Sequence, residues 1–412
     1  MPSGEVTFAL DIGTTKIAAA VGRRTLAGLS LLGFGVSPCS TIKRGVVTDL
    51  AGTADAIRTA AERAQRMAGV ELNRAWVGVT GPHITSLPAR GRLAISRNDR
   101  QVTAGDLREV MEAASRSGLL GSDRQLLHRV VRVFSVDGQN GVRNPLGMSA
   151  ARLEADLLLI AGARNFLDNI EKSVARAGFA VREMVFNPIA SADAVLQAAE
   201  QELGVALADV GGTTTDFAVY ARGLLCGVGS LPVGGGHVTQ DISIGLSLPR
   251  EEAERLKLDY GSAIAELVSE EERIKIESGE GARLVSRQLV AGIGEARMRE
   301  LFSLLGKAIS EVPEKPALPC GLVLTGGGAL LPGALELAGE VLGAKARLAR
   351  PRRMVVEGRT EALEGATYSA TAGLLHYAEK ERRASRLSSR PRRRVGEAWR
   401  ALWSWMKGRL TE

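Results

Sequence analysis

The chain has 412 residues, 45% of them apolar and only 4% aromatic, which suits roughly two to four globular domains with aliphatic cores. Three isolated cysteines, Cys39, Cys226 and Cys320, argue against a disulfide framework and favour a reducing cytoplasm. The net charge of +7 lies in residues 381–412, which hold ten basic and three acidic side chains, so the body of the chain is neutral and no nucleic-acid partner is expected.

The amino terminus enters an apolar run within a few residues, and no apolar run approaches the ~20 residues that a membrane span requires. We therefore expect a chain that is made in the cytoplasm and stays there. The four histidines lack metal-ligand spacing and are expected to be surface or hydrogen-bonded core residues: His83, His128, His237 and His376.

The first informative stretch is residues 6–21, V-T-F-A-L-D-I-G-T-T-K-I-A-A-A-V. Its two apolar runs flank Asp-x-Gly and Thr-Thr, a pattern that predicts two strands joined by a tight hairpin. A helix from about Asp49 to Met67 and a strand within residues 70–81 complete one α/β half-domain.

Residues from about His83 to Ala161 interrupt this alternation of strands and helices. They predict a strand, a helix from Thr103 to Ser117 and two further strands, which together form an inserted subdomain. The subdomain contains no constellation of catalytic side chains. A plain structural insertion and a protein-docking module both remain open.

The hairpin pattern recurs at residues 205–220, V-A-L-A-D-V-G-G-T-T-T-D-F-A-V-Y. An ordinary glycine-containing hairpin would explain one copy, but two copies with matching Asp, Gly and Thr indicate a shared chemical task. Glycine lets backbone amides approach a ligand, and amides and Thr hydroxyls can donate to phosphate oxygens. The predicted phosphate-binding residues are Gly13, Thr14, Thr15, Lys16, Gly211, Gly212, Thr213 and Thr214.

A carboxylate heads each turn, Asp11 in the first copy and Asp209 in the second. A bare carboxylate beside a phosphate would repel it. We therefore expect this pair to hold a hydrated Mg²⁺ that bridges the carboxylates and the phosphates.

Two later stretches complete a nucleotide site. Residues 231–236, L-P-V-G-G-G, form a loop-to-helix junction that can point amides at phosphates. Residues 321–333, G-L-V-L-T-G-G-G-A-L-L-P-G, predict a short buried strand that ends in Gly326, Gly327 and Gly328, followed by an apolar helix to about Leu342. Glycines at the end of such a strand mark the ligand crevice of an α/β sheet, and here they would give adenosine a flat backbone surface.

A charged helix between these stretches begins near Pro249. Glu254 and Lys257 are three residues apart and so share one helix face. The carboxylate can accept from ribose hydroxyls and the lysine can lie along the purine. On the bare pattern, a solvated ion pair is the commoner interpretation.

The carboxy-terminal tail predicts a membrane anchor. Residues 381–394 have almost no apolar content and are expected to form a disordered linker, and residues 395–412 place apolar side chains at helical spacing. A basic amphipathic helix rich in Trp suits the surface of an anionic lipid bilayer, although docking on a partner or on the body of the chain is the alternative. The membrane-binding residues would be Trp399, Arg400, Leu402, Trp403, Met406 and Lys407.

These motifs together resemble the actin-like ATPase superfamily, with two phosphate motifs and an adenosine motif in the right order. The insertion after Val79-Thr80-Gly81 and the tail resemble, more narrowly, the FtsA family of bacterial cell-division proteins. The strings that carry this resemblance are D-I-G-T-T-K at 11, V-G-V-T-G-P-H-I at 77, N-P-L-G-M at 144, D-V-G-G-T-T-T-D at 209, L-T-G-G-G-A at 324 and A-T-A-G-L-L-H-Y at 370. Thr213, where the family usually has a third glycine, and the short tail linker depart from it.

The resemblance implies a duplicated, ribonuclease-H-like α/β core with ATP and Mg²⁺ between its halves. The implied parts are a first half (1–82 and 163–192), an inserted subdomain (83–162), a second half (193–236 and 300–380), a small subdomain (237–299), the linker (381–394) and the amphipathic helix (395–412). It also assigns Glu254 and Lys257 to the nucleoside. Asn187 lies where many relatives place the Gln or Glu that orients the attacking water, so we expect slow or negligible hydrolysis.

The resemblance implies a membrane tether. The small subdomain would hold the C-terminal tail of FtsZ, and the insertion would contact neighbouring subunits in a filament and later division proteins at the septum, on the cytoplasmic face of the plasma membrane. A PilM-like pilus scaffold with the same ATP-binding core is the alternative. A DnaK-type chaperone would need a further domain after residue 380, and a small-molecule kinase would need a catalytic carboxylate that we do not find.

Overall fold

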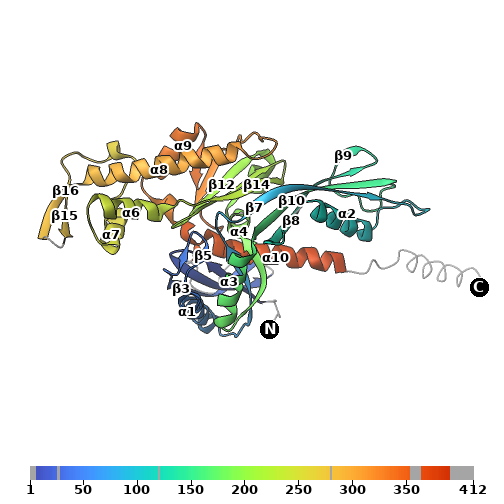
Figure 1. Ribbon diagram of the computed structural model, residues 1–412, viewed down its shortest axis with the longest axis horizontal. Coiled ribbons are helices and arrows are strands. Elements are labelled where there is room, and N and C mark those ends of the chain that lie inside the picture. Colours follow the sequence, from blue (N-terminus) through green and yellow to red (C-terminus); the bar gives the residue numbers. More distant parts are fainter. Residues whose placement is uncertain (1–5, 26–27, 119–120, 279–280, 353–362, 390–412) are drawn as a thin grey trace, which may run out of the picture.

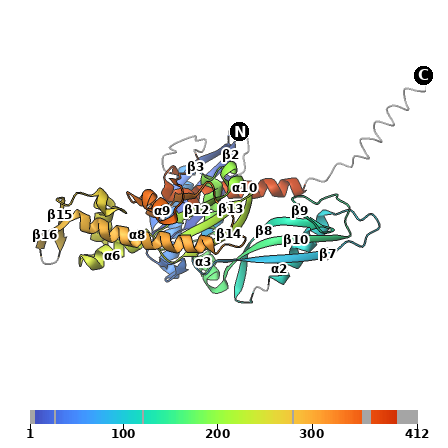
Figure 2. The ribbon, with the colours of Figure 1, turned by 90° about the horizontal axis from the view of Figure 1, so that it is seen from above.

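A computed structural model describes residues 6–25, 28–118, 121–278, 281–352 and 363–389 of the chain. The molecule is elongated, with two α/β sheets in the middle and a smaller subdomain at each end (Figure 1). The view from above keeps the same order along the long axis (Figure 2).

The two central sheets share one topology. Each begins with an antiparallel meander of three strands, and two further strands then add in parallel beside the first strand of the meander. The first sheet has the order β11-β6-β1-β2-β3, with β1 (Val6–Ile12), β2 (Lys16–Thr25), β3 (Gly28–Pro38), β6 (Arg74–Val79) and β11 (Ala180–Phe186). The second has the order β14-β13-β12-β17-β18, with β12 (Val205–Val210), β13 (Thr215–Ala221), β14 (Leu224–Leu231), β17 (Leu322–Thr325) and β18 (Ala346–Leu348). The duplicated α/β fold predicted from the repeat is confirmed.

Helix α1 (Leu50–Ala68) shows how the sequence builds the first half. Asp49 caps it by accepting from the N–H of Ala51, and Gly69 ends it in the left-handed region at φ 64°. Its small buried residues pack very closely on β3, because a Cβ added at Gly33 would lie 2.0 Å from the carbonyl oxygen of Ala64. Further helices of the two halves are α3 (Arg164–Arg176), α4 (Asn187–Val195), α5 (Ala198–Leu203) and α9 (Ala334–Leu342).

The inserted segment forms its own antiparallel sheet in the order β7-β10-β8-β9, with α2 (Ala104–Ser117) packed on β7 and β10. Thr103 caps α2 in a capping box with Asp106, which Arg97 also holds at 2.6 Å. The strands are β7 (Thr85–Ala94), β8 (Arg124–Val136), β9 (Gln139–Val142) and β10 (Arg152–Ala163).

His128 ties this sheet to the first half. The N–H of Phe186 donates to its Nε2 at 3.0 Å, and its Nδ1 lies 3.2 Å from the hydroxyl of Tyr377. Burial lowers the pKa of His128 to about 4, so the ring is neutral at physiological pH. This histidine is a hydrogen-bonded core residue, as expected.

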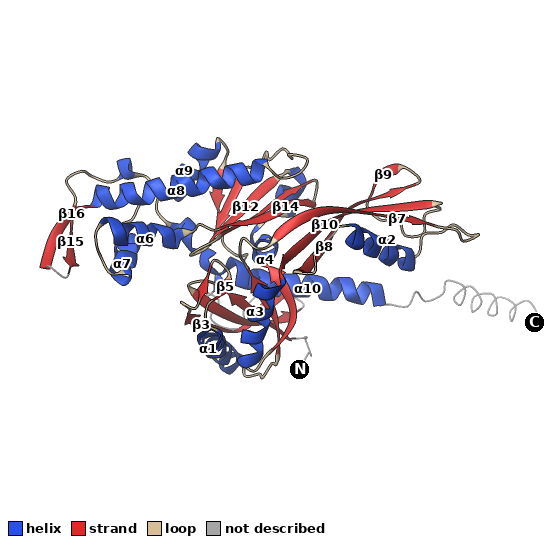
Figure 3. Ribbon diagram, in the orientation of Figure 1, coloured by secondary structure: helices blue, strands red, loops and turns tan. Residues whose placement is uncertain are grey.

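The opposite end of the molecule is mainly helical, whereas the insertion is mainly strand (Figure 3). It contains α6 (Gly235–Gly245), α7 (Arg250–Tyr260) and the start of α8 (Arg287–Ser310). It also contains an antiparallel hairpin, β15 (Arg273–Ser278) with β16 (Gly281–Ser286).

Helix α10 (Ser369–Ser389) corrects one expectation. The linker was expected to begin at residue 381, but the helix continues to Ser389. Contacts with β1 hold this part of the helix, because Arg382 donates to the Thr7 hydroxyl at 2.6 Å and to the Val6 carbonyl at 3.2 Å. A composition that predicts disorder in an isolated segment is thus overridden by tertiary contacts.

Candidate nucleotide site

The two predicted phosphate loops meet between the halves. Strand pairing ends at Ile12 with Ile17 in the first hairpin and at Val210 with Thr215 in the second, which leaves residues 13–16 and 211–214 as the turns. The N–H of Thr213 donates to the hydroxyl of Thr14 at 3.2 Å. A Cβ added at Gly212 would lie 2.4 Å from Cγ2 of Thr15, so the two loops pack closely there.

The two carboxylates that head the turns are held by one helix. Asp11 accepts from Nδ2 of Asn187 at 3.1 Å, and Asp209 accepts from the hydroxyl of Ser191 at 2.7 Å. Asn187 and Ser191 are four residues apart, so α4 presents both from the same face. Thr371, in the first turn of α10, donates to the second oxygen of Asp11 at 3.0 Å.

Burial sets the charge state of this cluster. It raises the pKa of Asp11 and raises that of Asp209 to about 6, although hydrogen bonds and the charge of Lys16 oppose the change. Burial likewise lowers the pKa of Lys16, against the attraction of both carboxylates. Buried carboxylate oxygens with raised pKa values fit a divalent cation and its water, because the cation would replace protons and offset their mutual repulsion.

Asp216 belongs to the same cluster and was not predicted as a site residue. It pairs directly with Asp209 across the second hairpin. Burial raises the pKa of Asp216 to about 7, and its Oδ1 has no hydrogen-bond partner in the part of the chain that the structure describes. The last letter of D-V-G-G-T-T-T-D was the available signal, because its spacing places it opposite Asp209.

The adenosine glycines lie against the second phosphate loop. Gly326 has φ 89°, and a Cβ on it would lie 2.4 Å from Oδ1 of Asp209. A Cβ on Gly235 would lie 3.0 Å from the Cα of Gly328, and the N–H of Gly235 donates to the carbonyl of Gly211 at 2.9 Å. One backbone surface is therefore formed by residues 211–212, 234–236 and 326–328. Gly327 has more room around it than its neighbours Gly326 and Gly328.

Glu254 and Lys257 form the ion pair that their spacing predicts, with Nζ and Oε2 2.7 Å apart. Lys257 also lies 3.5 Å from the carbonyl of Gly235, so the pair sits beside the glycine surface. Burial raises the pKa of Glu254, but hydrogen bonds from Lys257 and Thr239 outweigh it and lower the pKa below its usual range. Their assignment to ribose and purine stays a prediction.

Asn187 is buried, and its amide nitrogen is occupied by Asp11. Its Oδ1 has no hydrogen-bond partner among the described residues and lies 2.4 Å from where a Cβ on Gly78 would be. An amide cannot accept a proton from water as a base. Slow hydrolysis therefore stays a prediction.

The predictions on the membrane anchor and on the metal ion have no direct counterpart among the described residues. The residues of the tail helix, including Trp399 and Trp403, lie outside the described residues. In the described part of the chain, no helix has the length and apolar character to cross a membrane. Nor do three His, Cys, Asp or Glu side chains group there as a metal site, so the Mg²⁺ prediction rests on contacts through water.

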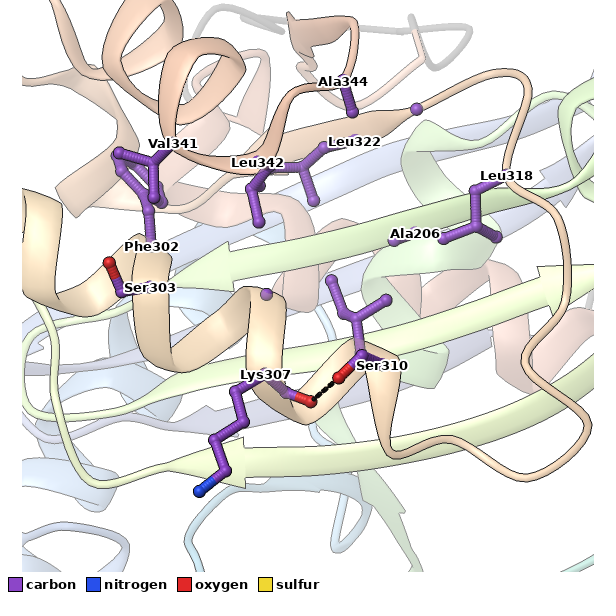
Figure 4. A pocket seen from close by; sticks show the side chains of 13 residues that line it. Ala206, Phe302, Ser303, Lys307, Ser310, Leu318, Leu322, Val341, Leu342 and Ala344 are labelled. Atoms are coloured by element: carbon purple, nitrogen blue, oxygen red, sulfur yellow. Dashed lines mark hydrogen bonds between the residues drawn. The ribbon is translucent and has the colours of Figure 1, made fainter.

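A separate groove of about 510 Å³ lies between α8, α9 and β17 (Figure 4). Its walls are mostly apolar, with Phe302 from α8, Leu322 from β17 and Leu342 from α9. The amine of Lys307 points away from these side chains (Figure 4). None of the predicted site residues lines this groove, so it is not part of the nucleotide site.

Comparisons with known proteins point to one family. The model of the family described as "Cell division protein FtsA" matches residues 206–373, and that of the "SHS2 domain inserted in FTSA" matches residues 81–161. The cell division protein FtsA of Pseudomonas aeruginosa is 39% identical over 378 residues, which cover 91% of this chain and 89% of the relative. That of Bacillus subtilis is 36% identical over 354 residues, with 85% and 80% covered.

Solved structures share the fold at low identity. A PilM–PilN type IV pilus biogenesis complex has a TM-score of 0.64 and 15% identity, covering 90% of this chain and 97% of that one. MreB5 of Spiroplasma citri bound to ADP has a TM-score of 0.56 and 13% identity, covering 95% and 100%. Likeness at this identity shows the actin-like fold alone.

Proposed function

We propose, because this chain belongs to the FtsA family of cell-division proteins, that it tethers FtsZ filaments to the cytoplasmic face of the plasma membrane and polymerises there. It would organise the division ring at the septum and recruit later division proteins. The observation that carries the proposal is the 39% identity to a family member over 91% of the chain. The likeness to a PilM–PilN complex is one of fold, so it does not favour a pilus scaffold.

ATP with Mg²⁺ would bind between the halves. The support is the meeting of two phosphate loops, buried carboxylates and a glycine surface at one place. Residues 13–16 and 211–214 would hold the phosphates, and Asp11 and Asp209 would hold the hydrated Mg²⁺, which neutralises phosphate charge when bound. Since Thr371 links Asp11 to α10, and α10 leads towards the tail, occupancy of the site can influence how the tail is presented.

The C-terminal tail of FtsZ would bind the small subdomain. Several large apolar side chains of this subdomain are more than half exposed, which is typical of a protein-binding surface. They are Ile244 at 70%, Leu258 at 69%, Leu267 at 70%, Leu284 at 69% and Leu289 at 52%. Among the described residues of the insertion, only Leu146 at 39% is an exposed large apolar side chain.

The insertion would make the contacts between subunits and with later division proteins. Its sheet is braced against the second half, because Arg132 pairs with Glu314 at 2.7 Å and the Ser86 hydroxyl donates to the Val228 carbonyl at 3.2 Å. A braced sheet can pass a change in the cleft to a bound neighbour. The tail helix, with Trp399 and Trp403 on its apolar stripe, would anchor the assembly in anionic lipid.

Sedimentation with vesicles tests the proposal. The full chain and a chain that ends at Arg394 are mixed with ATP, Mg²⁺, FtsZ and vesicles of acidic lipid. We expect FtsZ to sediment with the vesicles only when residues 395–412 are present. If the full chain binds vesicles but leaves FtsZ in solution, the anchor is right and the partner is wrong.

Two substitutions separate the FtsZ surface from the anchor. Leu258→Asp or Leu284→Asp is expected to leave vesicle binding intact and to release FtsZ, because a charge replaces an exposed apolar contact. Leu146→Asp is the matched control, since it places the same charge at an exposed leucine of the insertion. Equal loss of FtsZ in all three variants would contradict the assignment of the surface.

A further inference from the structure

A short hairpin of the first half reaches the second phosphate loop. Strands β4 (Ile42–Lys43) and β5 (Val46–Val47) pair Ile42 with Val47 and Lys43 with Val46, so Arg44 and Gly45 form a two-residue turn. Both turn residues have positive φ, 50° for Arg44 and 78° for Gly45. Such turns favour Asn-Gly, and a side chain as large as that of Arg is disfavoured at the first position.

Tight packing holds the turn in place. A Cβ added at Gly45 would lie 2.0 Å from the carbonyl oxygen of Thr80, so the second turn residue has to be glycine. The N–H of Arg44 donates to the hydroxyl of Thr213 at 3.0 Å. The hydroxyl of Thr80 lies 3.1 Å from that of Thr214. The turn therefore bridges the two halves at the phosphate loop.

The guanidinium of Arg44 has no counter-ion in the described part of the chain, where the residue is exposed and makes no ion pair. Its charge is felt by His237, whose pKa is lowered by burial and further by the cations of Arg297 and Arg44. His237 lies in the first turn of α6, where helix amides also carry positive potential. An anion between Arg44 and this turn would be attracted by both the guanidinium and the helix amides.

We propose that Arg44 contacts the terminal phosphate of the bound nucleotide and makes the site prefer a triphosphate to a diphosphate. The inference rests on the proposed nucleotide binding and assigns that site a further residue. The backbone N–H of Arg44 donates to Thr213, and the side chain supplies a positive charge at the second phosphate loop. The disfavoured turn residue is then kept for its charge.

Affinities for ATP and ADP, each with Mg²⁺, test this in the full-length protein by isothermal titration calorimetry. Arg44→Gly and Arg44→Asn remove the charge but suit positive φ, so the turn and its N–H contact are retained. We expect ATP binding about tenfold weaker in both, the scale of one charge-assisted hydrogen bond, and ADP binding within about twofold. Arg44→Lys should retain part of the preference for ATP.

Lys43→Ala is the matched control, because it removes an exposed cation one residue away. It is expected to leave both affinities unchanged. If Arg44→Asn weakens ATP and ADP equally, or neither, the inference is overturned while nucleotide binding stands. If the unmodified protein binds neither nucleotide, the proposed function itself fails and this inference fails with it.

Discussion

The two phosphate hairpins share one pattern but add side chains of opposite charge to it, Lys16 in the first and Asp216 in the second. Both turns place a glycine against the carbonyl three residues later, since a Cβ on Gly13 would lie 2.7 Å from the oxygen of Lys16 and one on Gly211 3.0 Å from that of Thr214. In this alignment Lys16 of the first hairpin corresponds to Thr214 of the second.

The strand partners differ as well. Asp11 pairs with Ala18, whereas Asp209 pairs with Asp216. The first hairpin therefore adds a cation to its carboxylate, and the second adds a further anion. The two copies therefore keep the same backbone pairing and differ in the charge of the side chains that surround the leading carboxylate.

The largest expected effect is a loss of ATP affinity when Lys16 is exchanged. Lys16→Thr gives the first hairpin the residue of the second and removes the cation that attracts Asp11 and Asp209. We expect ATP affinity to fall on the order of 100-fold, or about 2.7 kcal/mol, because a charge-assisted contact is lost and two buried anions lose their counter-ion. Calorimetric titration with Mg²⁺ and ATP measures it.

The reciprocal change is the control. Thr214→Lys places a cation at the equivalent position of the second turn. We expect this cation to reduce the difference in charge between the hairpins, but not to replace the contact of Lys16 with the phosphate. ATP binding by Lys16→Thr within about threefold of the unmodified protein would contradict the assignment of Lys16 to phosphate.

Removing the extra anion of the second hairpin should stabilise the nucleotide-free protein. Burial raises the pKa of Asp216 to about 7, above its unfolded value of 3.8. Between these values the unfolded chain loses its proton first, so the native state loses stability as pH rises from about 4 to 7. Asp216→Asn keeps the shape without the charge. We expect its free energy of unfolding at pH 8 to exceed that of the unmodified protein by about 2–4 kcal/mol.

Urea unfolding at pH 4.5 and pH 8 checks the sign. The advantage of Asp216→Asn should be small at pH 4.5, where the carboxyl is protonated in the folded state, and full at pH 8. Asp55→Asn is the control, because Asp55 is 71% exposed in its pair with Arg58. An advantage that is the same at both pH values would mean that the ionised carboxylate is not the destabilising group.

What the sequence could predict follows from how each contact is made. Asp11, Asp209 and the loop glycines were predictable because a repeat with fixed spacing places them in turns. Thr371 was not, because it reaches Asp11 across 360 residues, and no local pattern marks such a contact. Arg44 was missed for the same reason, since its partner Thr213 is 169 residues away.

The length of α10 was predicted wrongly because of its composition. Its polar composition predicted a linker from residue 381, but contacts of Arg382 with β1 hold the helix. The duplicated sheets, by contrast, followed from apolar runs and turn residues within single segments. Local patterns therefore predicted the fold and the residues of the two turns, and the long-range partners needed the structure.

The smallest expected effect follows from substitutions in α4, the helix that donates hydrogen bonds to the leading carboxylates of both hairpins. Ser191→Ala removes a hydroxyl that donates to Asp209, and Asn187→Ala removes the amide that donates to Asp11. Each hydrogen bond lowers the pKa of its carboxyl, so each loss should raise that pKa further, at a cost of about 1 kcal/mol in the Mg²⁺–ATP complex. Burial raises the pKa of Asp209 to about 6, so a further rise in Ser191→Ala should increase proton release on binding at pH 7. Calorimetry in two buffers of different ionisation enthalpy measures that release.

Ser173→Ala is the control, because Ser173 is a buried serine whose hydroxyl is hydrogen-bonded within α3. Equal release from both variants would show that the two carboxylates take up the cation alike, and the difference in charge between the hairpins would then rest on Lys16 and Asp216 alone.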